Sequence, residues 1–140
     1  MRHLPAIVIV VSLLALAACV SKPESRPDEL MELQRTTAGD LDVVLLAKSG
    51  VLPAGRSQAT LEFQRASDRH LVDVGTVKVG AAMDMAGLGP MLGSVFVSKG
   101  KTPGRYTLDT DLGMTGTWNL TVQWDGPAGS GSVTFPGNVR

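Results

Sequence analysis

Cysteine and histidine are scarce in this chain: Cys19 is the only cysteine, and His70 is the only histidine that follows it. A lone cysteine excludes an intramolecular disulfide, so an exported domain of this chain would depend on packing alone. The sequence also lacks a Gly-x-Ser-x-Gly elbow, which many nucleophilic hydrolases carry. These absences lead us to expect a protein that is not an enzyme.

An excess of charge of either sign is also missing. The chain has 13 basic and 13 acidic residues, so its formal net charge is zero. A balanced chain creates no strong field toward nucleic acid or an anionic surface. The basic residues are scattered along the sequence, which is not typical of a nucleic-acid interface. We therefore expect no nucleic-acid partner.

Long apolar runs are limited to one, over residues 6–16 near the start of the chain. This run is shorter than the ~20 residues that a transmembrane helix needs. Arg2 precedes it, and the small residues Ala17 and Ala18 follow it. A basic start, a short apolar core and small residues at its end are typical of a secretory signal peptide. We expect that signal peptide over residues 1–18.

The position of Cys19 directly after these small residues resembles the lipobox of bacterial lipoproteins. The resemblance implies cleavage before Cys19, a lipid on its thiol and new amino group, and a membrane anchor facing the periplasm. Val20 stands where an aspartate would signal retention in the inner membrane, so the resemblance favours the outer membrane. Prolines and charges in residues 20–29 are typical of a tether. We expect the lipidated cysteine and tether to occupy residues 19–38.

From Leu41 onward, apolar and polar residues alternate between turn-forming clusters, and no helical periodicity is evident. This pattern predicts an all-β domain over residues 39–140, an immunoglobulin-like antiparallel β-sandwich of about seven strands. A small barrel is the alternative, and residues 30–33 are expected to be irregular or a strand. The expected strands cover residues 41–46, 57–65, 72–79 with a break near Gly75, 93–97, 105–109, 117–124 and 130–135.

Methionines gather in the second half of the chain. Met83 and Met85 are two residues apart, so on a strand they share one face. The following turn can bring Met91 back beside them, and Met114 begins a later strand that could lie close. Thioethers are soft, neutral ligands that select Cu(I) over hard cations. These four methionines therefore predict a Cu(I) or Ag(I) site, which Trp118 could shield through a cation–π contact.

Core packing is the alternative interpretation of the same methionines. Methionine is a flexible side chain that fills gaps in cores and packs well against aromatic rings. Two methionines on one face of a strand can therefore be core residues with no ligand. The residue types alone leave both interpretations open.

Several short motifs occur in the order found in a known family. They are Met83-Asp84-Met85, Gly89-Pro90-Met91, Gly104-Arg105-Tyr106 and Met114-Thr115-Gly116-Thr117-Trp118. Together they resemble the YtkA-like domain, which is related to FixH-type proteins, over residues 39–135. The resemblance implies an immunoglobulin-like sandwich outside a membrane, with a role in copper handling, heavy-metal efflux or cytochrome oxidase assembly. Leu88 stands where many relatives would have one more methionine.

Two functions of different classes follow from these patterns. In the first, a lipid-anchored periplasmic accessory domain handles Cu(I) or Ag(I) for a heavy-metal efflux or cytochrome oxidase assembly complex. In the second, a metal-free module docks a membrane complex through a sandwich edge or the methionine-rich loop. Trp118 and Trp124 share one face of an expected strand. They are candidate interaction residues, or else core residues.

Two other sets of polar residues could take part in chemistry. His70 follows a turn, so we expect a solvated side chain rather than a metal ligand, because a ligand needs partners. Asp109 and Asp111 share one strand face, and paired carboxylates can perform acid–base chemistry when they are buried together. Here we expect a solvated edge instead.

Overall fold

The computed structural model describes residues 30–140, and the structural observations below concern this part of the chain. The predicted signal peptide, Cys19 and the tether up to residue 29 lie outside the described residues. Within residues 30–140 we find no helix long and apolar enough to cross a membrane.

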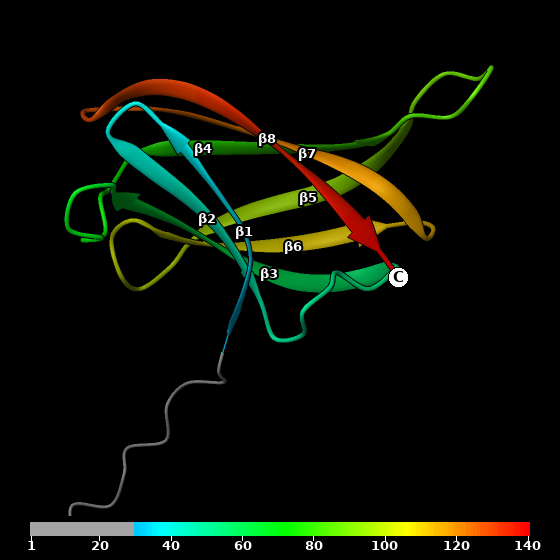
Figure 1. Cartoon of the computed structure of the whole chain (residues 1–140), viewed down its shortest axis with the longest axis horizontal. Helices are drawn as coiled ribbons and strands as arrows, with labels where there is room; N and C mark the ends of the chain where they lie inside the picture. The colour runs from blue at the N-terminus through cyan, green and yellow to red at the C-terminus, as the bar shows by residue number, and fades with distance from the viewer. Residues whose placement is uncertain (1–29) are drawn as a thin grey trace, which may run out of the picture.

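Eight antiparallel strands, joined by turns and loops, make up the described part of the chain (Figure 1). They are β1 (Met31–Ala38), β2 (Leu41–Ala47), β3 (Gly55–Arg65), β4 (Thr76–Met83), β5 (Met91–Lys99), β6 (Arg105–Leu112), β7 (Gly116–Gly126) and β8 (Gly129–Val139). The predicted all-β antiparallel fold is confirmed, with one strand more than expected.

The additional strand is β1, which lies in the segment that we predicted as tether. It pairs with β2 from Met31 opposite Ala47 to Ala38 opposite Leu41. The predicted tether over residues 19–38 is therefore wrong for residues 31–38. The polar composition of β1 is typical of a loop, but a strand with a single hydrogen-bonded neighbour can expose many polar side chains.

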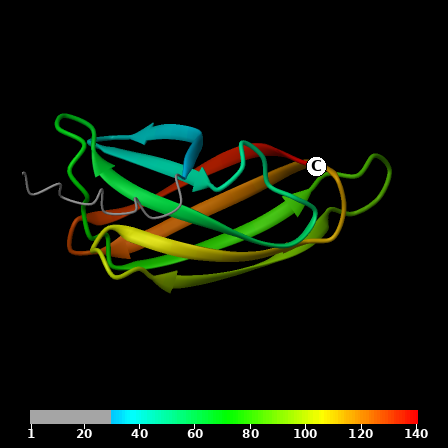
Figure 2. The same ribbon diagram turned by 90° about the horizontal axis from the view of Figure 1, so that it is seen from below.

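The strands follow the order β1-β2-β3-β6-β5-β4-β7-β8, and β5 connects the two layers of the sandwich. The start of β5 pairs with the end of β4, where Met91 stands opposite Met83. The rest of β5 pairs with β6, beginning with Ser94 opposite Asp111. Figure 1 shows β4, β7 and β8 in one layer and β2, β3 and β6 in the other. The turn between β4 and β5 projects beyond the strands at one end (Figures 1 and 2).

Gly93 stands where β5 changes partner. A Cβ atom at this position would lie 2.6 Å from Cδ2 of Leu112 and 3.0 Å from Cζ3 of Trp118. Glycine in a strand is typical of a close approach or a bend. The missing side chain therefore lets β5 pass directly over the core as it changes layer.

The core lies between the two layers and has an aromatic centre. The ring of Phe63 makes edge-to-face contacts with Tyr106, at a centroid distance of 5.6 Å, and with Trp124, at 5.3 Å. Such contacts add to the stability gained by burying the rings. The Tyr106 hydroxyl donates a hydrogen bond to the Gly75 carbonyl at 3.0 Å, so the loop before β4 is tied to the core.

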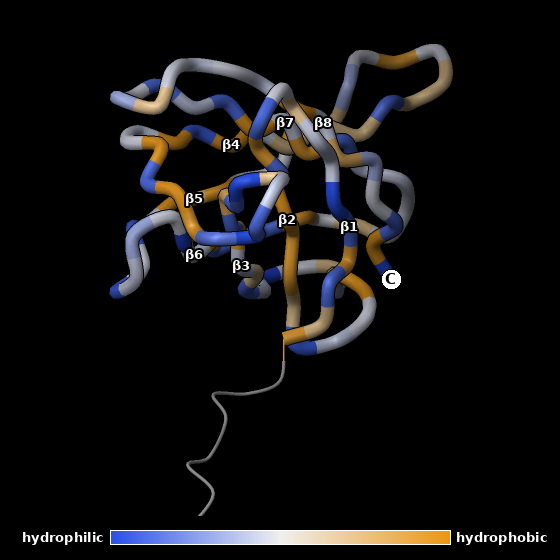
Figure 3. Tube along the Cα trace, turned by 60° about the vertical axis from the view of Figure 1, so that its left-hand side comes forward, coloured by the Kyte–Doolittle hydropathy of each residue, from blue (hydrophilic) through white to orange (hydrophobic). Residues whose placement is uncertain are grey.

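A ladder of polar side chains crosses the outer face of β1, β2, β3 and β6. Arg35 Nη1 donates to Asp42 Oδ2 at 2.9 Å and to Gln64 Oε1 at 3.0 Å. Gln64 Nε2 donates to Glu62 Oε2 at 2.8 Å, and Arg105 Nε donates to Glu62 Oε1 at 2.7 Å. Figure 3 shows that β2 is apolar along most of its length. The ladder covers the outer face of β2, so residues on both faces of this strand are buried.

This ladder predicts that the domain loses stability in acid. Hydrogen bonds from Thr37 and then Arg35 lower the pKa of Asp42, and Arg35 likewise lowers the pKa of Glu32. A carboxyl group whose pKa is lower in the folded than in the unfolded state stabilises the fold. This stabilisation is complete above the unfolded pKa of about 4, and it is lost as the pH falls through the folded pKa. Denaturant titrations between about pH 6 and 3 should show a falling unfolding free energy. Asp42→Asn should flatten that dependence, and an unchanged slope in this variant would contradict the role of Asp42.

Candidate functional site

Two of the methionines predicted as ligands face each other across a strand pair. Met83 ends β4, and Met91 begins β5 directly opposite. Cross-strand partners have Cβ atoms about 4.5–5.5 Å apart on the same face of the sheet. The side chain of Met83 is only 8% exposed, and Met91 packs against the core from its margin. The fold therefore brings these two thioethers together at one end of the sandwich.

Met85 follows immediately after β4 and lies at the same end. Its backbone carbonyl accepts a hydrogen bond from the Leu88 N–H at 3.1 Å, which closes the turn toward β5. The Met85 side chain is half-buried against the core, whereas Asp84 is exposed and accepts a bond from Asn119 Nδ2 at 3.4 Å. β4 ends at Met83, so Asp84 and Met85 follow the strand, and the buried Met83 and half-buried Met85 contrast with the exposed Asp84.

Met114 lies in the connection between β6 and β7. Trp118 Nε1 donates a hydrogen bond to the Met114 carbonyl at 3.0 Å, so this connection is held against the core. Two residues later, Gly116 has a φ of +141°, and a Cβ atom there would lie 2.7 Å from the Met83 sulfur. Gly116 therefore leaves the space that the Met83 thioether occupies. The Met114 side chain is 39% exposed.

We call Met83, Met85, Met91 and Met114 the methionine cluster. Its members range from buried to exposed, so the cluster extends from the core to the surface at the end where the β4–β5 turn projects. Within residues 30–140 there is no group of three or more histidine, cysteine, aspartate or glutamate side chains that could hold a metal ion. The four thioethers are soft and neutral, with the exposed carboxylate of Asp84 beside them, and thioethers fit Cu(I) or Ag(I) better than a hard cation.

His70 lies at the opposite end of the molecule from the methionine cluster. It precedes β4, whereas Met83 ends that strand, so the full length of β4 separates them. His70 Nδ1 is 3.1 Å from Asp68 Oδ2, and the His70 side chain is exposed. Hydrogen bonds from the backbone and side chain of His70 lower the pKa of Asp68 to about 2. The solvated position that we expected for His70 is confirmed.

Asp109 and Asp111 share the outer face of β6 and are exposed, as expected. Asp109 Oδ1 accepts a hydrogen bond from Gln58 Nε2 at 3.0 Å. Asp111 Oδ2 lies 3.6 Å from Nε of Arg56. An exposed pair without a buried environment is not suited to acid–base catalysis.

Both tryptophans are core residues. Trp118 is 0% exposed and Trp124 is 6% exposed. Their prediction as interaction residues is wrong, because β7 lies between β4 and β8 and directs its apolar face toward the other layer. The sandwich has few large side chains with which to fill its interior, so it buries both indoles.

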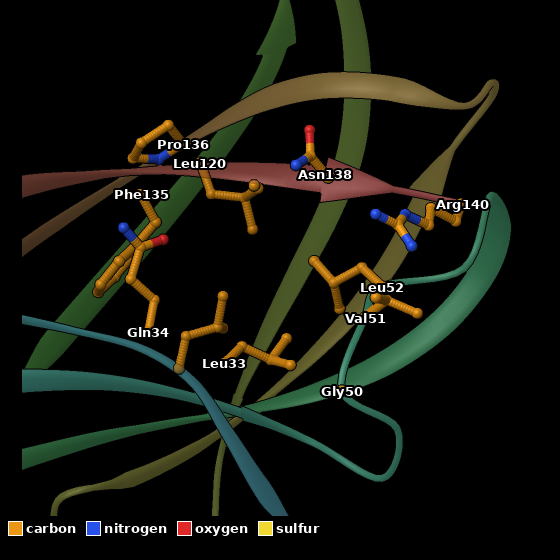
Figure 4. A pocket seen from close by; sticks show the side chains of 12 residues that line it. Leu33, Gln34, Gly50, Val51, Leu52, Leu120, Phe135, Pro136, Asn138 and Arg140 are labelled. Atoms are coloured by element: carbon orange, nitrogen blue, oxygen red, sulfur yellow. The ribbon is translucent and has the colours of Figure 1, made fainter.

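A shallow hollow of about 210 Å³ lies between β1 and β8, the strands at the two ends of the sheet order (Figure 4). Leu33 and Gln34 line it from β1, while Phe135 and Pro136 line it from β8. Arg140 is the one charged residue in its lining. Sequence reasoning missed this hollow because it depends on β1, which we did not expect as a complete strand.

Two large apolar side chains on the outer face of β5 were not predicted from the sequence. Leu92 is 77% exposed and Phe96 is 73% exposed, and both point outward from this strand. The alternation could have indicated this orientation, because Val95 and Val97 on either side of Phe96 face the core.

Comparisons with known proteins identify a family for this chain. A family model described as YtkA-like matches residues 35–123, which contain the whole methionine cluster. No curated protein matches the chain. Among solved structures, a copper-bound variant of FetP from uropathogenic Escherichia coli strain F11 matches with a TM-score of 0.49 and 7% sequence identity. That match covers 79% of this chain and 97% of the FetP chain.

Proposed function

This chain belongs to the YtkA-like family, and we propose that it binds Cu(I) or Ag(I) through the methionine cluster. The observation that carries the proposal is the pairing of Met83 with Met91 beside the Met114 segment. Met83 and Met91 would supply the inner ligands, and Met85 and Met114 would complete the set from the surface side. Each of these residues lies in or beside a turn at one end of the sandwich.

The chemistry of the cluster supports transient handling of a soft monovalent ion. A thioether carries no proton at ordinary pH, so ion binding releases no proton from the ligands. A site that reaches the surface can pass its ion to a partner without unfolding the domain. The Met83 sulfur lies where a side chain at position 116 would stand, so the position of this thioether depends on Gly116.

We further propose that the domain works as a lipid-anchored accessory on the periplasmic side of a membrane, with the outer membrane favoured over the inner. The lipobox-like sequence that ends at Cys19 supports this placement. In this position the domain would deliver the ion to, or receive it from, a heavy-metal efflux or cytochrome oxidase assembly complex. The competing function is a metal-free module that docks such a complex.

A competition titration tests the metal proposal. The whole chain is titrated with Cu(I) against a chelator of known affinity, in parallel with a variant that carries Met83→Leu, Met85→Leu and Met91→Leu. Leucine nearly conserves volume and apolarity, so the variant should fold. We expect its affinity for Cu(I) to fall by more than about 100-fold, because even changes in outer-shell partners cost 10- to 100-fold.

Met31→Leu is the matched control, since Met31 is exposed on β1, outside the cluster. It should bind Cu(I) as the parent does. Absence of Cu(I) binding by the parent would contradict the metal function and favour the metal-free module. Equal affinities of the triple variant and the parent for Cu(I) would contradict this site, and the ion would then bind at another place in the chain.

A further inference from the structure

Phe96 stands apart from the other aromatic residues of the chain. The sequence has six aromatic residues, and all of them lie within residues 30–140. Phe96 is 73% exposed, whereas the other five are buried: Phe63, Tyr106, Trp118, Trp124 and Phe135. A chain with so few aromatic rings places one of them on its outer surface, where it does not contribute to the core.

Two carboxylates lie beside the Phe96 ring. Asp109 is the direct partner of Phe96 in the pairing of β5 with β6, and Asp111 pairs with Ser94, two residues before Phe96. Side chains that are directly opposite or diagonal on one face of a sheet are within reach of each other. Together with Arg56 they line a shallow hollow of about 430 Å³ on the outer face.

The negative charge of this hollow is only weakly offset by neighbouring groups. Asp109 accepts a hydrogen bond from Gln58, which is neutral. The Arg56 side chain, 3.6 Å from Asp111, is 92% exposed. An ion pair at such a solvated position contributes little. A cation that enters the hollow would therefore meet an incompletely neutralised pair of carboxylates.

Leu92 is a second exposed apolar side chain on this face of β5, with Ser94 between it and Phe96. It lies four residues before Phe96, so both side chains point outward from the strand. Leu92 is 77% exposed, and Leu88 in the preceding turn is 70% exposed. Single exposed apolar residues are ordinary. Here the Phe96 ring and the two carboxylates lie on the β5–β6 pair, and Leu92 lies on the part of β5 that pairs with β4.

We propose that this outer face of β5 and β6 binds a polypeptide segment that carries an arginine or lysine and, a few residues away, an apolar residue, because Leu92 and Phe96 are about 13 Å apart along the strand. The cation would lie over the Phe96 ring and pair with Asp109 and Asp111, and the apolar residue would contact Leu92. Cation–π attraction and charge-assisted hydrogen bonds act together at such a site. An anionic membrane surface is disfavoured, because the two carboxylates would be repelled by it. The inference does not depend on metal binding.

Peptide selection tests this chemistry directly. A library of random displayed peptides is selected on the whole chain and counter-selected on a Phe96→Ser variant. We expect the retained peptides to be enriched in arginine or lysine with an apolar residue a few positions away. Asp109→Asn and Phe96→Leu should each weaken a retained peptide by about tenfold, since each removes one of the two attractions on the cation.

Asp125→Asn is the matched control, because Asp125 is an exposed carboxylate on β7, outside this face. It should bind the same peptide as tightly as the parent. Retention of acidic or purely apolar peptides would overturn the proposal. So would a selection in which no peptide binds the parent more tightly than the Phe96→Ser variant. So would binding of anionic vesicles by a Cys19→Ser chain, if that binding is lost with Phe96→Ser.

Discussion

Replacing Phe63 with alanine is expected to lower the free energy of unfolding by roughly 3–5 kcal/mol, enough to unfold much of a marginally stable domain. Phe63 is fully buried and makes edge-to-face contacts with both Tyr106 and Trp124. Truncation removes the buried ring, leaves a cavity and deprives two other rings of their contact. Urea denaturation of parent and variant, followed by tryptophan fluorescence, measures the difference.

The same substitution at Phe96 provides the matched control. Phe96→Ala removes the same atoms from an exposed position, so the unfolding free energy should change by less than about 0.5 kcal/mol. Equal effects at the two positions would contradict the assignment of Phe63 to the core and Phe96 to the surface. A large loss at Phe96 alone would mean that its ring supports the fold rather than a partner.

Gly126→Ala is expected to be the second severe change, with a loss of about 3 kcal/mol in unfolding free energy. A Cβ atom at Gly126 would lie 2.3 Å from the Val74 carbonyl oxygen and 2.9 Å from the Gly75 Cα. These neighbours are backbone atoms, so a side-chain rotation cannot relieve the overlap. The end of β7 would have to move away from the segment that leads into β4. Thermal unfolding of the variant measures the cost.

Gly80→Ala is the control for Gly126→Ala. Gly80 lies within β4, and a Cβ atom there has no neighbour within 4 Å. Alanine restricts the unfolded chain more than glycine does, so this variant should be unchanged or more stable by up to about 1 kcal/mol. If Gly126→Ala were equally harmless, the close contact between these two backbone segments would be contradicted.

Much of the fold could be predicted because burial on one face leaves an alternating pattern in the sequence. In β7, Trp118, Leu120, Val122 and Trp124 alternate with polar residues, and the structure buries all four. β1 was missed because a strand beside a single neighbour needs few apolar residues. Its stability comes from pairing with β2 and from the hydrogen bonds of Arg35, which no local pattern reveals.

For the methionine cluster, the sequence could predict which residues take part but not how they pack. The spacing of Met83 and Met85 indicated that both side chains lie on one side of the chain, and the turn after them indicated that Met91 comes back beside them. The contact of the Met83 sulfur with Gly116 depends on how β7 packs on β4, so spacing could not indicate it. For Trp118 and Trp124, the alternation placed both indoles on one face. Only the packing of the two layers shows that this face is the interior.

The change of partner along β5 has a mechanical consequence for the whole domain. Two layers held together by side chains alone could slide past one another or separate without breaking a hydrogen-bond ladder. Here one uninterrupted strand is hydrogen-bonded to β4 at one end and to β6 over the rest, so shear between the layers must break backbone bonds. We therefore expect the two layers to unfold together in a single cooperative transition.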